Sequence, residues 1–163
     1  TDPGVITVGK IHAGTATNVI PDTCTIEGTA RTLSEGARKQ IAAGVERRCK
    51  GIAAANGGTV DFKWQRGYPA TVNDPAMADY VAHTARRAFG QDHFIPVDRP
   101  SMGGEDFAYY LEKTPGCFFL IGVEPPTAAG HPPLHSDHFD FTDAAIDVGG
   151  KMFGELVKNF RVS

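Results

Sequence analysis

Residues 67–75 read Gly67-Tyr-Pro-Ala-Thr-Val-Asn-Asp-Pro75, and this stretch divides the sequence into two portions of different character. An alternating, strand-like pattern ends before it, and a helical pattern begins after it. Asp74 is suited to cap that helix and Pro75 to occupy its first position. We therefore place a domain boundary here, between a portion at residues 1–72 and a portion at residues 73–163.

The first portion has the order strand, strand, helix, strand. Two runs rich in Val, Ile and Thr, at 5–11 and 24–33, are joined by turn-forming residues and predict antiparallel strands. Ser34 predicts the start of a helix and Gly57-Gly58 its end, and the helix has one apolar face, formed by Ala37, Ile41, Val45, Cys49 and Ile52. Alternation over residues 60–65 predicts another half-buried strand. This order matches the later part of a β-α-β-β-α-β split sandwich, so we expect the chain to be a piece of something larger.

The second portion alternates helices with short strands. The pattern predicts a helix from Asp74 to Phe89 that ends at Gly90, followed by a strand at 95–97, a loop at 100–106, a helix at 106–113, an apolar strand at 117–121, a polar loop at 124–141 and a final helix capped by Thr142. Alternating strands and helices predict a parallel α/β layer. The predicted fold class is α/β: a partial α+β portion followed by part of an α/β layer.

Composition excludes several classes of protein. The 163 residues are 41% apolar and 21% charged, which is typical of a folded globular chain and not of a disordered one. Sixteen basic and nineteen acidic residues give a net charge of −3, so we expect neither nucleic acid nor a membrane surface as a partner. The sequence shows no membrane-spanning run and no signal-peptide pattern, and its three cysteines suit small buried side chains in a reducing compartment. These features predict a cytoplasmic location.

A histidine-rich loop is the densest group of reactive side chains. Residues 131–140 contain His131, His135 and His138 together with Asp137 and Asp140. Imidazole and carboxylate groups hold zinc, manganese or cobalt in hydrolases, where the ion activates water. His135 is the best candidate ligand, although a solvated histidine-rich turn explains the spacing equally well, and the other histidines add no convincing second ligand.

Two further groups suggest anion binding. Gly103 and Gly104 precede a predicted helix start, where backbone N–H groups could receive a carboxylate or an oxyanion. Asn18 lies in the turn between the first two strands and Arg31 on the returning strand, and together they could bind a carboxylate. Turn geometry and a solvent-facing arginine are the simpler explanation of that second pair.

Five stretches occur in one order and together resemble one family: GTATNVIPD (14–22), GTART (28–32), YPATVND (68–74), SMGGEDFAYYLEKTPG (101–116) and LHSDHFDF (134–141). They resemble the metal-dependent amidohydrolases that include hippurate hydrolase, N-acyl-amino-acid deacylases and auxin-conjugate hydrolases. The resemblance implies a zinc-exopeptidase-like catalytic domain interrupted by a lid domain. Residues 1–72 would be the later part of the lid, which is also the dimerisation domain, and residues 73–163 the C-terminal part of the catalytic domain.

The same resemblance implies roles for individual residues. His135 matches the C-terminal metal ligand, Asn18 and Arg31 match lid residues that contact the substrate carboxylate, often across a dimer interface, and His12 is a further candidate contact near that turn. Gly103 and Gly104 match the loop that lines the substrate, although many relatives read GSED where this chain reads GGED. His138 matches no ligand position.

The resemblance also implies cofactors, partners and missing parts. The complete enzyme would bind two divalent ions (Zn, Mn, Co or Ni), hydrolyse N-acyl amino acids such as hippurate and form a homodimer through the lid. The other ligands and the glutamate general base would lie upstream, so this portion alone is expected to hold no metal and to be inactive. The alternatives are a non-catalytic module for amino-acid binding or dimerisation, and a relative that has lost its metals.

Overall fold

The computed structural model describes residues 2–124 and 130–160, and the chain divides into two compact units. The first unit comprises residues 1–71 and 98–110, and the second comprises residues 72–97 and 111–163. The boundary between the two units, which falls between Thr71 and Val72, lies close to the one that the sequence predicted. Residues 98–110, however, group with the first unit. The assignment of the two portions to a lid and a catalytic domain stays a prediction.

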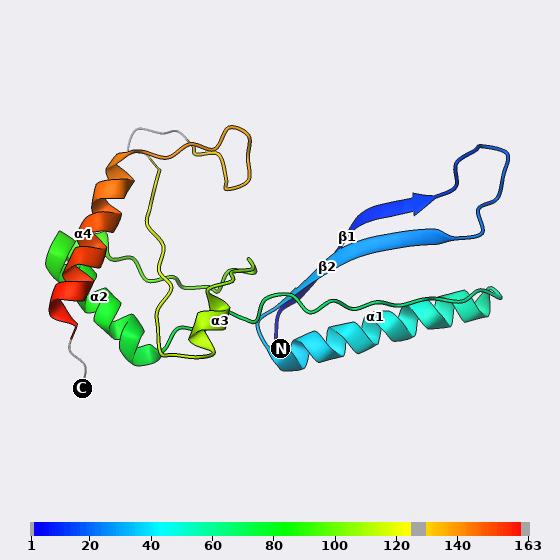
Figure 1. Ribbon diagram of the computed structural model, residues 1–163, viewed down its shortest axis with the longest axis horizontal. Helices are drawn as coiled ribbons and strands as arrows, with labels where there is room; N and C mark the ends of the chain where they lie inside the picture. The colour runs from blue at the N-terminus through cyan, green and yellow to red at the C-terminus, as the bar shows by residue number, and fades with distance from the viewer. Residues whose placement is uncertain (1, 125–129, 161–163) are drawn as a thin grey trace. The chain divides into compact units, whose positions relative to one another are not determined.

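A β-hairpin forms one layer of the first unit (Figure 1). Strand β1 (Gly4–Ala13) pairs antiparallel with β2 (Cys24–Thr32), as the sequence predicted. The register shifts between Val8 and Lys10, which makes Gly9 an extra residue without a partner on β2. Such a β-bulge changes the phase of side-chain alternation along its strand.

The bulge keeps one face of the hairpin apolar and the other polar. On either side of Gly9 the pairing places Ile6, Val8, Ile11 and Ile26 on one face. Without the extra residue, Ile11 would move to the opposite face. The polar face holds the Lys10–Glu27 ion pair, with its two charged atoms 2.9 Å apart, together with His12 and Arg31.

Helix α1 (Glu35–Ala55) packs against the apolar face of the hairpin. Ile41 lies so close to Gly4 that a Cβ on this glycine would be 2.6 Å from the Ile41 Cδ1 atom. The Ser34 hydroxyl accepts a hydrogen bond from the Ala37 N–H at 3.1 Å, which confirms the predicted cap. At the other end Gly57 adopts a φ of 73°, and the Gly58 N–H donates to the Ala53 carbonyl at 2.8 Å, so the predicted stop is confirmed.

The predicted apolar stripe of α1 is shorter than expected. Ala37, Ile41, Val45 and Cys49 are half-buried, whereas Ile52 is 68% exposed. The burial of this apolar face therefore extends as far as Cys49 and does not include Ile52.

The segment after α1 returns along this helix (Figure 1) without forming the predicted strand. Val60 and Phe62 are half-buried while their neighbours are exposed, so the alternation of burial is present. A strand also requires a hydrogen-bonded neighbour, and the described residues supply none. Arg38 of α1 fixes the segment instead, because its guanidinium donates to the Gly67 carbonyl at 3.3 Å and to the Tyr68 carbonyl at 2.5 Å.

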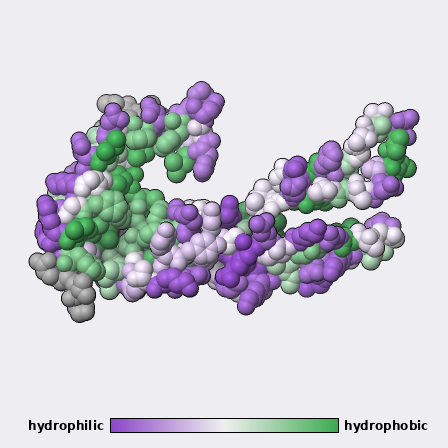
Figure 2. Space-filling view, in the orientation of Figure 1, coloured by the Kyte–Doolittle hydropathy of each residue, from purple (hydrophilic) through white to green (hydrophobic). Residues whose placement is uncertain are grey.

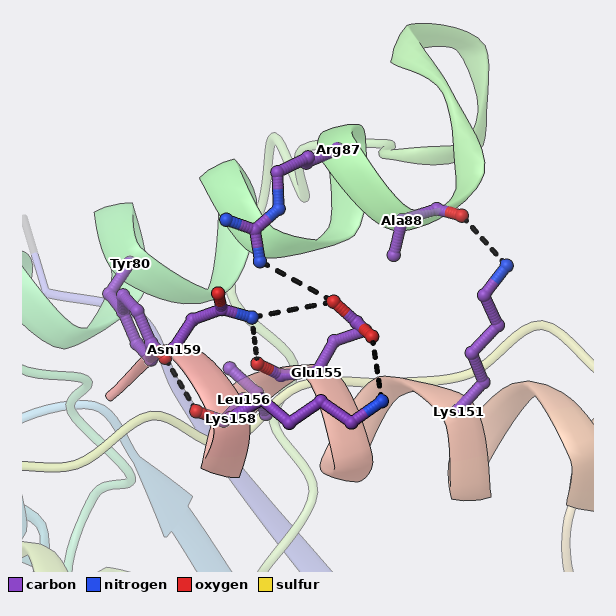
Figure 3. Close-up of polar contacts among 8 residues, drawn as sticks. All are labelled: Tyr80, Arg87, Ala88, Lys151, Glu155, Leu156, Lys158 and Asn159. Atoms are coloured by element: carbon purple, nitrogen blue, oxygen red, sulfur yellow. Dashed lines mark hydrogen bonds and ion pairs between the residues drawn. The ribbon is translucent and has the colours of Figure 1, made fainter.

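Two hydrogen bonds link a pair of antiparallel helices in the second unit (Figure 3). In helix α2 (Pro75–Phe89) the Tyr80 hydroxyl donates to the Leu156 carbonyl of helix α4 (Ala144–Asn159) at 2.6 Å. At the other end of the contact the Lys151 ammonium donates to the Ala88 carbonyl at 2.9 Å. Asp74 caps α2 by accepting from the Met77 N–H at 3.0 Å, and Gly90 ends it, as predicted.

Glu155 is the charged centre of this helix pair. Its carboxylate lies 3.3 Å from the Lys158 ammonium and 3.5 Å from the Arg87 guanidinium. The hydrogen bond from Lys158 is the largest of the effects that lower the pKa of Glu155 below its ordinary value, and Asn159 and Arg87 act in the same direction. Glu155 is therefore ionised at neutral pH and links α2 to α4.

Several predicted elements of the second portion differ in the structure. Residues 95–97 and 117–121 form no strand, and helix α3 (Ala108–Leu111) is shorter than the predicted 106–113. A short 3₁₀ turn, η1 (Gln91–His93), follows α2. Helix α4 begins after Asp143 and not after a Thr142 cap, and the Asp143 side chain makes no capping hydrogen bond.

The apolar segment 117–121 has a side chain as its hydrogen-bonding partner in place of a strand. The Asn73 amide donates to the Phe118 carbonyl and accepts from the Phe118 N–H, both at 2.8 Å. The same amide lies 3.3 Å from the Cys117 sulfur. Burial raises the pKa of the Cys117 thiol, which favours its protonated form. Cys24, by contrast, is exposed and not buried as the sequence suggested.

Helices and the hairpin give a mixed α/β architecture, as predicted, with much apolar surface uncovered. The chain exposes 13048 Å², whereas a folded single domain of its length would expose about 7,900 Å². Among the described residues only Val81, Ala82, Ala108 and Met152 are buried apolar side chains. Figure 2 shows hydrophobic residues at the outer end of the hairpin, where Ile20 is 92% exposed. None of the described helices is both long and apolar enough to cross a membrane.

Candidate substrate-binding site

Arg31 is the centre of the candidate site in the first unit. It lies near the end of β2, opposite Val5, on the polar face of the hairpin. Its side chain makes no hydrogen bond or ion pair with residues 2–124 or 130–160, although the hairpin carries acidic residues. An arginine side chain offers five N–H donors in a planar fork, so this one can bind a carboxylate.

Gly104 meets Arg31 within the same unit. A Cβ placed on Gly104 would lie 2.7 Å from the Arg31 Nη1 atom and 3.2 Å from the Tyr68 Cδ2 atom. The structure thus brings together two residues that the sequence placed in one site from separate motifs. Gly103 lies beside them in the chain, but its N–H already donates to the Ser101 hydroxyl at 3.1 Å.

The 101–106 loop is a poorer anion cradle than the sequence suggested. Besides the Gly103 N–H, the Phe107 N–H is also occupied, by the Glu105 carboxylate at 3.2 Å. The helix that follows has only four residues, Ala108–Leu111, so its dipole offers little attraction to an anion. Any anion held here would depend mainly on the Arg31 cation.

His12 and Asn18 lie at the other end of the hairpin. His12 is opposite Thr25 and Asn18 lies in the loop between the strands, whereas Arg31 is opposite Val5. Thr25 and Arg31 are six residues apart on β2, which corresponds to about 20 Å along the strand. Asn18 and Arg31 therefore do not bind one carboxylate together within a single chain, and the paired arrangement inferred from the sequence is not formed.

The three histidines of the 131–140 loop have different surroundings. The His131 Nδ1 atom lies 3.0 Å from the Pro132 carbonyl oxygen, and its ring packs edge-on against Phe139 with centroids 5.5 Å apart. His138 lies 3.7 Å from the Asp137 carboxylate and is 83% exposed in its side chain. His135 is exposed in a turn with a φ of 70°, and no partner is recorded for its imidazole among the described residues.

The described residues contain no group of three or more His, Cys, Asp or Glu side chains placed to hold a metal ion. Among the described residues His135 therefore offers a single donor and is not part of a ligand cluster. No metal ion could be held by this loop without further ligands.

Sequence reasoning missed the aromatic side chains beside Arg31. Tyr68 packs edge-on against Tyr109, with ring centroids 5.9 Å apart, and both rings remain nearly half exposed. Tyr68 opens the YPATVND stretch and Tyr109 lies in SMGGEDFAYYLEKTPG. Both lie within motifs that the sequence had already singled out, but only their contact in three dimensions connects them to Arg31.

The chain is similar to known proteins over nearly its whole length. N-acetylcysteine deacetylase of Bacillus subtilis is 35% identical over 152 residues, which cover 93% of this chain and 38% of that protein. Thermostable carboxypeptidase 1 of Saccharolobus solfataricus is 30% identical over 159 residues, which cover 97% of this chain and 39% of that protein. This chain thus spans about two fifths of the length of these relatives.

A solved structure is also similar to this chain over most of its length. The Bacillus subtilis YXEP protein, described as a dinuclear metal binding peptidase from the M20 family, matches with a TM-score of 0.78 at 34% identity. The match covers 94% of this chain and 40% of that one. The profile of peptidase family M20/M25/M40 matches residues 2–159, nearly the whole sequence. The chain therefore belongs to peptidase family M20/M25/M40.

Proposed function

We propose that the complete protein is a metal-dependent amidohydrolase that cleaves the amide bond of N-acyl amino acids, including hippurate-like compounds. In this proposal residues 1–72 are the later part of a lid and residues 73–163 the C-terminal part of the catalytic domain. Among the relatives are a deacetylase of an N-acetylated amino acid and a carboxypeptidase. Substrates of both kinds carry a carboxylate close to the bond that is cleaved.

The observation that carries the proposal is the guanidinium of Arg31 beside Gly104. It is exposed, it has no acidic partner among the described residues, and it lies beside Gly104 of the loop that would line the substrate. An exposed arginine without an acidic partner is solvated by water at little cost in free energy. Its N–H donors can therefore form a bidentate pair with a carboxylate. Arg31 would hold the amino-acid end of the substrate and so orient the amide bond.

The metal ions of the proposed enzyme do not fit the described residues alone, because these contain no three-ligand cluster. His135 would contribute one imidazole, and the remaining ligands and the general base are expected in sequence outside this chain. The role derived for this chain is therefore binding and orientation of the substrate by Arg31.

The length of the hairpin supports a homodimer. His12, opposite Thr25, lies about 20 Å along the strands from Arg31, and Asn18 lies in the loop beyond His12, which is too far to share one small substrate. If all three residues contact substrate, the tip of one hairpin would serve the site of a second copy. We propose such an arrangement through the lid portion.

Hydrolysis of N-acetylated amino acids by the complete protein tests the reaction. We expect activity that a chelator abolishes and that Zn, Mn, Co or Ni restores. Activity that survives thorough removal of metal would contradict the proposal. Binding of N-acyl amino acids without any hydrolysis would favour the alternative, a non-catalytic binding module.

His135 has a matched control in the same loop. His135→Ala in the complete protein should lose one metal equivalent by elemental analysis, because an imidazole ligand is removed. His138→Ala removes another exposed imidazole of the same loop that is assigned no ligand role, and should retain the full metal content. Equal metal content in both variants would place the ligand elsewhere.

A further inference from the structure

Two groups, the Arg31 guanidinium and the Tyr68 ring, adjoin the space where a side chain at position 104 would lie. A Cβ on Gly104 would be 2.7 Å from Arg31 Nη1, 3.5 Å from Arg31 Cζ and 3.2 Å from Tyr68 Cδ2. The first of these distances is well below van der Waals contact. The guanidinium can occupy its observed place only because residue 104 has no side chain.

No charged partner holds the Arg31 guanidinium in its observed place. No hydrogen bond or ion pair is recorded for this side chain within residues 2–124 and 130–160, and the space that a Cβ on Gly104 would take adjoins both the guanidinium and the Tyr68 ring. Its N–H donors consequently remain available to a ligand. A guanidinium bonded to an acidic residue would not offer them.

The backbone and the ring of Tyr68 each make a contact of their own within the first unit. The Arg38 guanidinium, only 14% exposed, donates to the Gly67 and Tyr68 carbonyls and so anchors this segment to α1. On its other side the Tyr68 ring contacts the edge of Tyr109. The space beside Gly104 thus adjoins the ring of a residue whose backbone is anchored to α1.

We infer that Gly104 is a positioning residue, which acts through Arg31 to set the place of the substrate carboxylate. The inference rests on the proposed function and deepens it: the favoured substrates are amides whose amino-acid part carries a free carboxylate that the Arg31 fork can bind in two places. Chains with a side chain at this position would hold the cation elsewhere and would accept the carboxylate at a different distance from the amide bond.

A side chain at position 104 should affect binding more than folding. The atom it would displace is the far end of a flexible, exposed arginine, which can rotate away at little cost. Gly104→Ala is therefore expected to leave the melting temperature nearly unchanged while it moves the guanidinium. Gly51→Ala, a glycine of α1 with nothing within 4 Å of its added Cβ, is the matched control.

The test measures kcat and KM of the complete enzyme with an N-acetylated amino acid and with its uncharged carboxamide analogue. Gly104→Ala should raise KM for the carboxylate about tenfold, with little change in kcat or with the carboxamide. Arg31→Ala should lower kcat/KM for the carboxylate by about 10- to 100-fold. In the Arg31→Ala background, Gly104→Ala should have no further effect, and Gly51→Ala should match the parent throughout.

Each other outcome identifies what failed. If Arg31→Ala impairs the carboxylate substrate but Gly104→Ala does not, or if Gly104→Ala costs the same with and without Arg31, the positioning role is wrong. If neither variant has an effect, both the carboxylate role of Arg31 and the role of Gly104 are wrong. If the enzyme hydrolyses nothing, the proposed function fails. Calorimetric binding of the same N-acetylated amino acid to the same variants then tests the role of Gly104. If no binding is detected, that role is wrong as well.

Discussion

Gly28 of β2 differs from Gly104 in what a side chain there would meet. At Gly28 the nearest atoms belong to the backbone, and no flexible side chain is present that could move aside. A Cβ on Gly28 would collide with the Thr7 carbonyl oxygen of β1 and lie 3.4 Å from Val8 Cα. Both neighbours belong to the backbone beside the bulge. The same chemical change at two glycines therefore has different consequences, because one would displace a side chain and the other a strand.

Gly28→Ala is expected to destabilise the protein by about 1–3 kcal/mol, because the two strands must separate locally. Gly9→Ala is the control: it lies in the same hairpin, and nothing is found within 4 Å of its added Cβ. Denaturant unfolding of both variants measures the difference. Equal stability of the two would contradict the close approach of Thr7 to Gly28.

Glu155 gives a prediction about pH. Lys158, Asn159 and Arg87 lower its pKa in the folded protein below the ordinary value of 4.5, so its contribution is present above that pH and is lost as the pH falls through the folded pKa. Glu155→Gln should therefore lower Tm at pH 7 but have progressively less effect below pH 4.5. Thermal unfolding across this range checks the sign, and a difference that grows on acidification would contradict it.

Two of the predicted helix starts are confirmed, whereas the Thr142 cap of the final helix is not. Ser34 and Asp74 cap helices through hydrogen bonds to a backbone N–H three residues later. Such contacts are local, so the residues that make them are visible in the sequence. The strands at 60–65, 95–97 and 117–121 were predicted wrongly because a strand depends on a partner that can lie anywhere in the protein.

The candidate site shows the same division between local and distant information. Motifs identified Arg31 and Gly104 separately, whereas the packing of Tyr68 and Tyr109 beside them needed the fold. The hairpin also placed Asn18 far from Arg31, which no spacing in the sequence could reveal without the register.

Two aspartates at helix starts provide a matched test of capping. The Asp74 carboxylate accepts the Met77 N–H at the start of α2, whereas Asp143 precedes α4 without a side-chain capping bond. Asp74→Ala should therefore cost about 1 kcal/mol of unfolding free energy, and Asp143→Ala clearly less. Chemical denaturation of the two variants measures this, and an equal loss would mean that Asp143 also caps its helix.

The whole chain leaves apolar side chains in contact with water. Ile6, Val8, Ile11 and Ile26 are each more than half exposed on the hairpin face next to α1. Relatives more than twice as long as their match to this chain have additional sequence that could cover such surface. The proposal that this chain acts with other parts of a larger protein accounts for such an exposed face.

This exposure predicts the behaviour of residues 1–163 expressed alone. The polypeptide should bind an apolar dye such as anilinonaphthalene sulfonate and increase its fluorescence, because uncovered apolar surface attracts it. The complete protein at equal molarity should bind much less. Weak dye fluorescence from the isolated chain would show that its hairpin is covered in solution, and loss of near-ultraviolet circular dichroism would show instead that the chain had unfolded.

The extra residue at Gly9 has a consequence for how this protein can be redesigned. By restoring the alternation after Val8, it keeps Ile6 and Ile11 on the face next to α1 and Thr7, Lys10 and Thr29 on the opposite face, which carries Arg31. Thr7, Lys10 and Thr29 can then be exchanged without changing the face on which Ile6 and Ile11 lie. The hairpin face next to α1 can therefore be redesigned for stability and the opposite face for selectivity, each without changing the other.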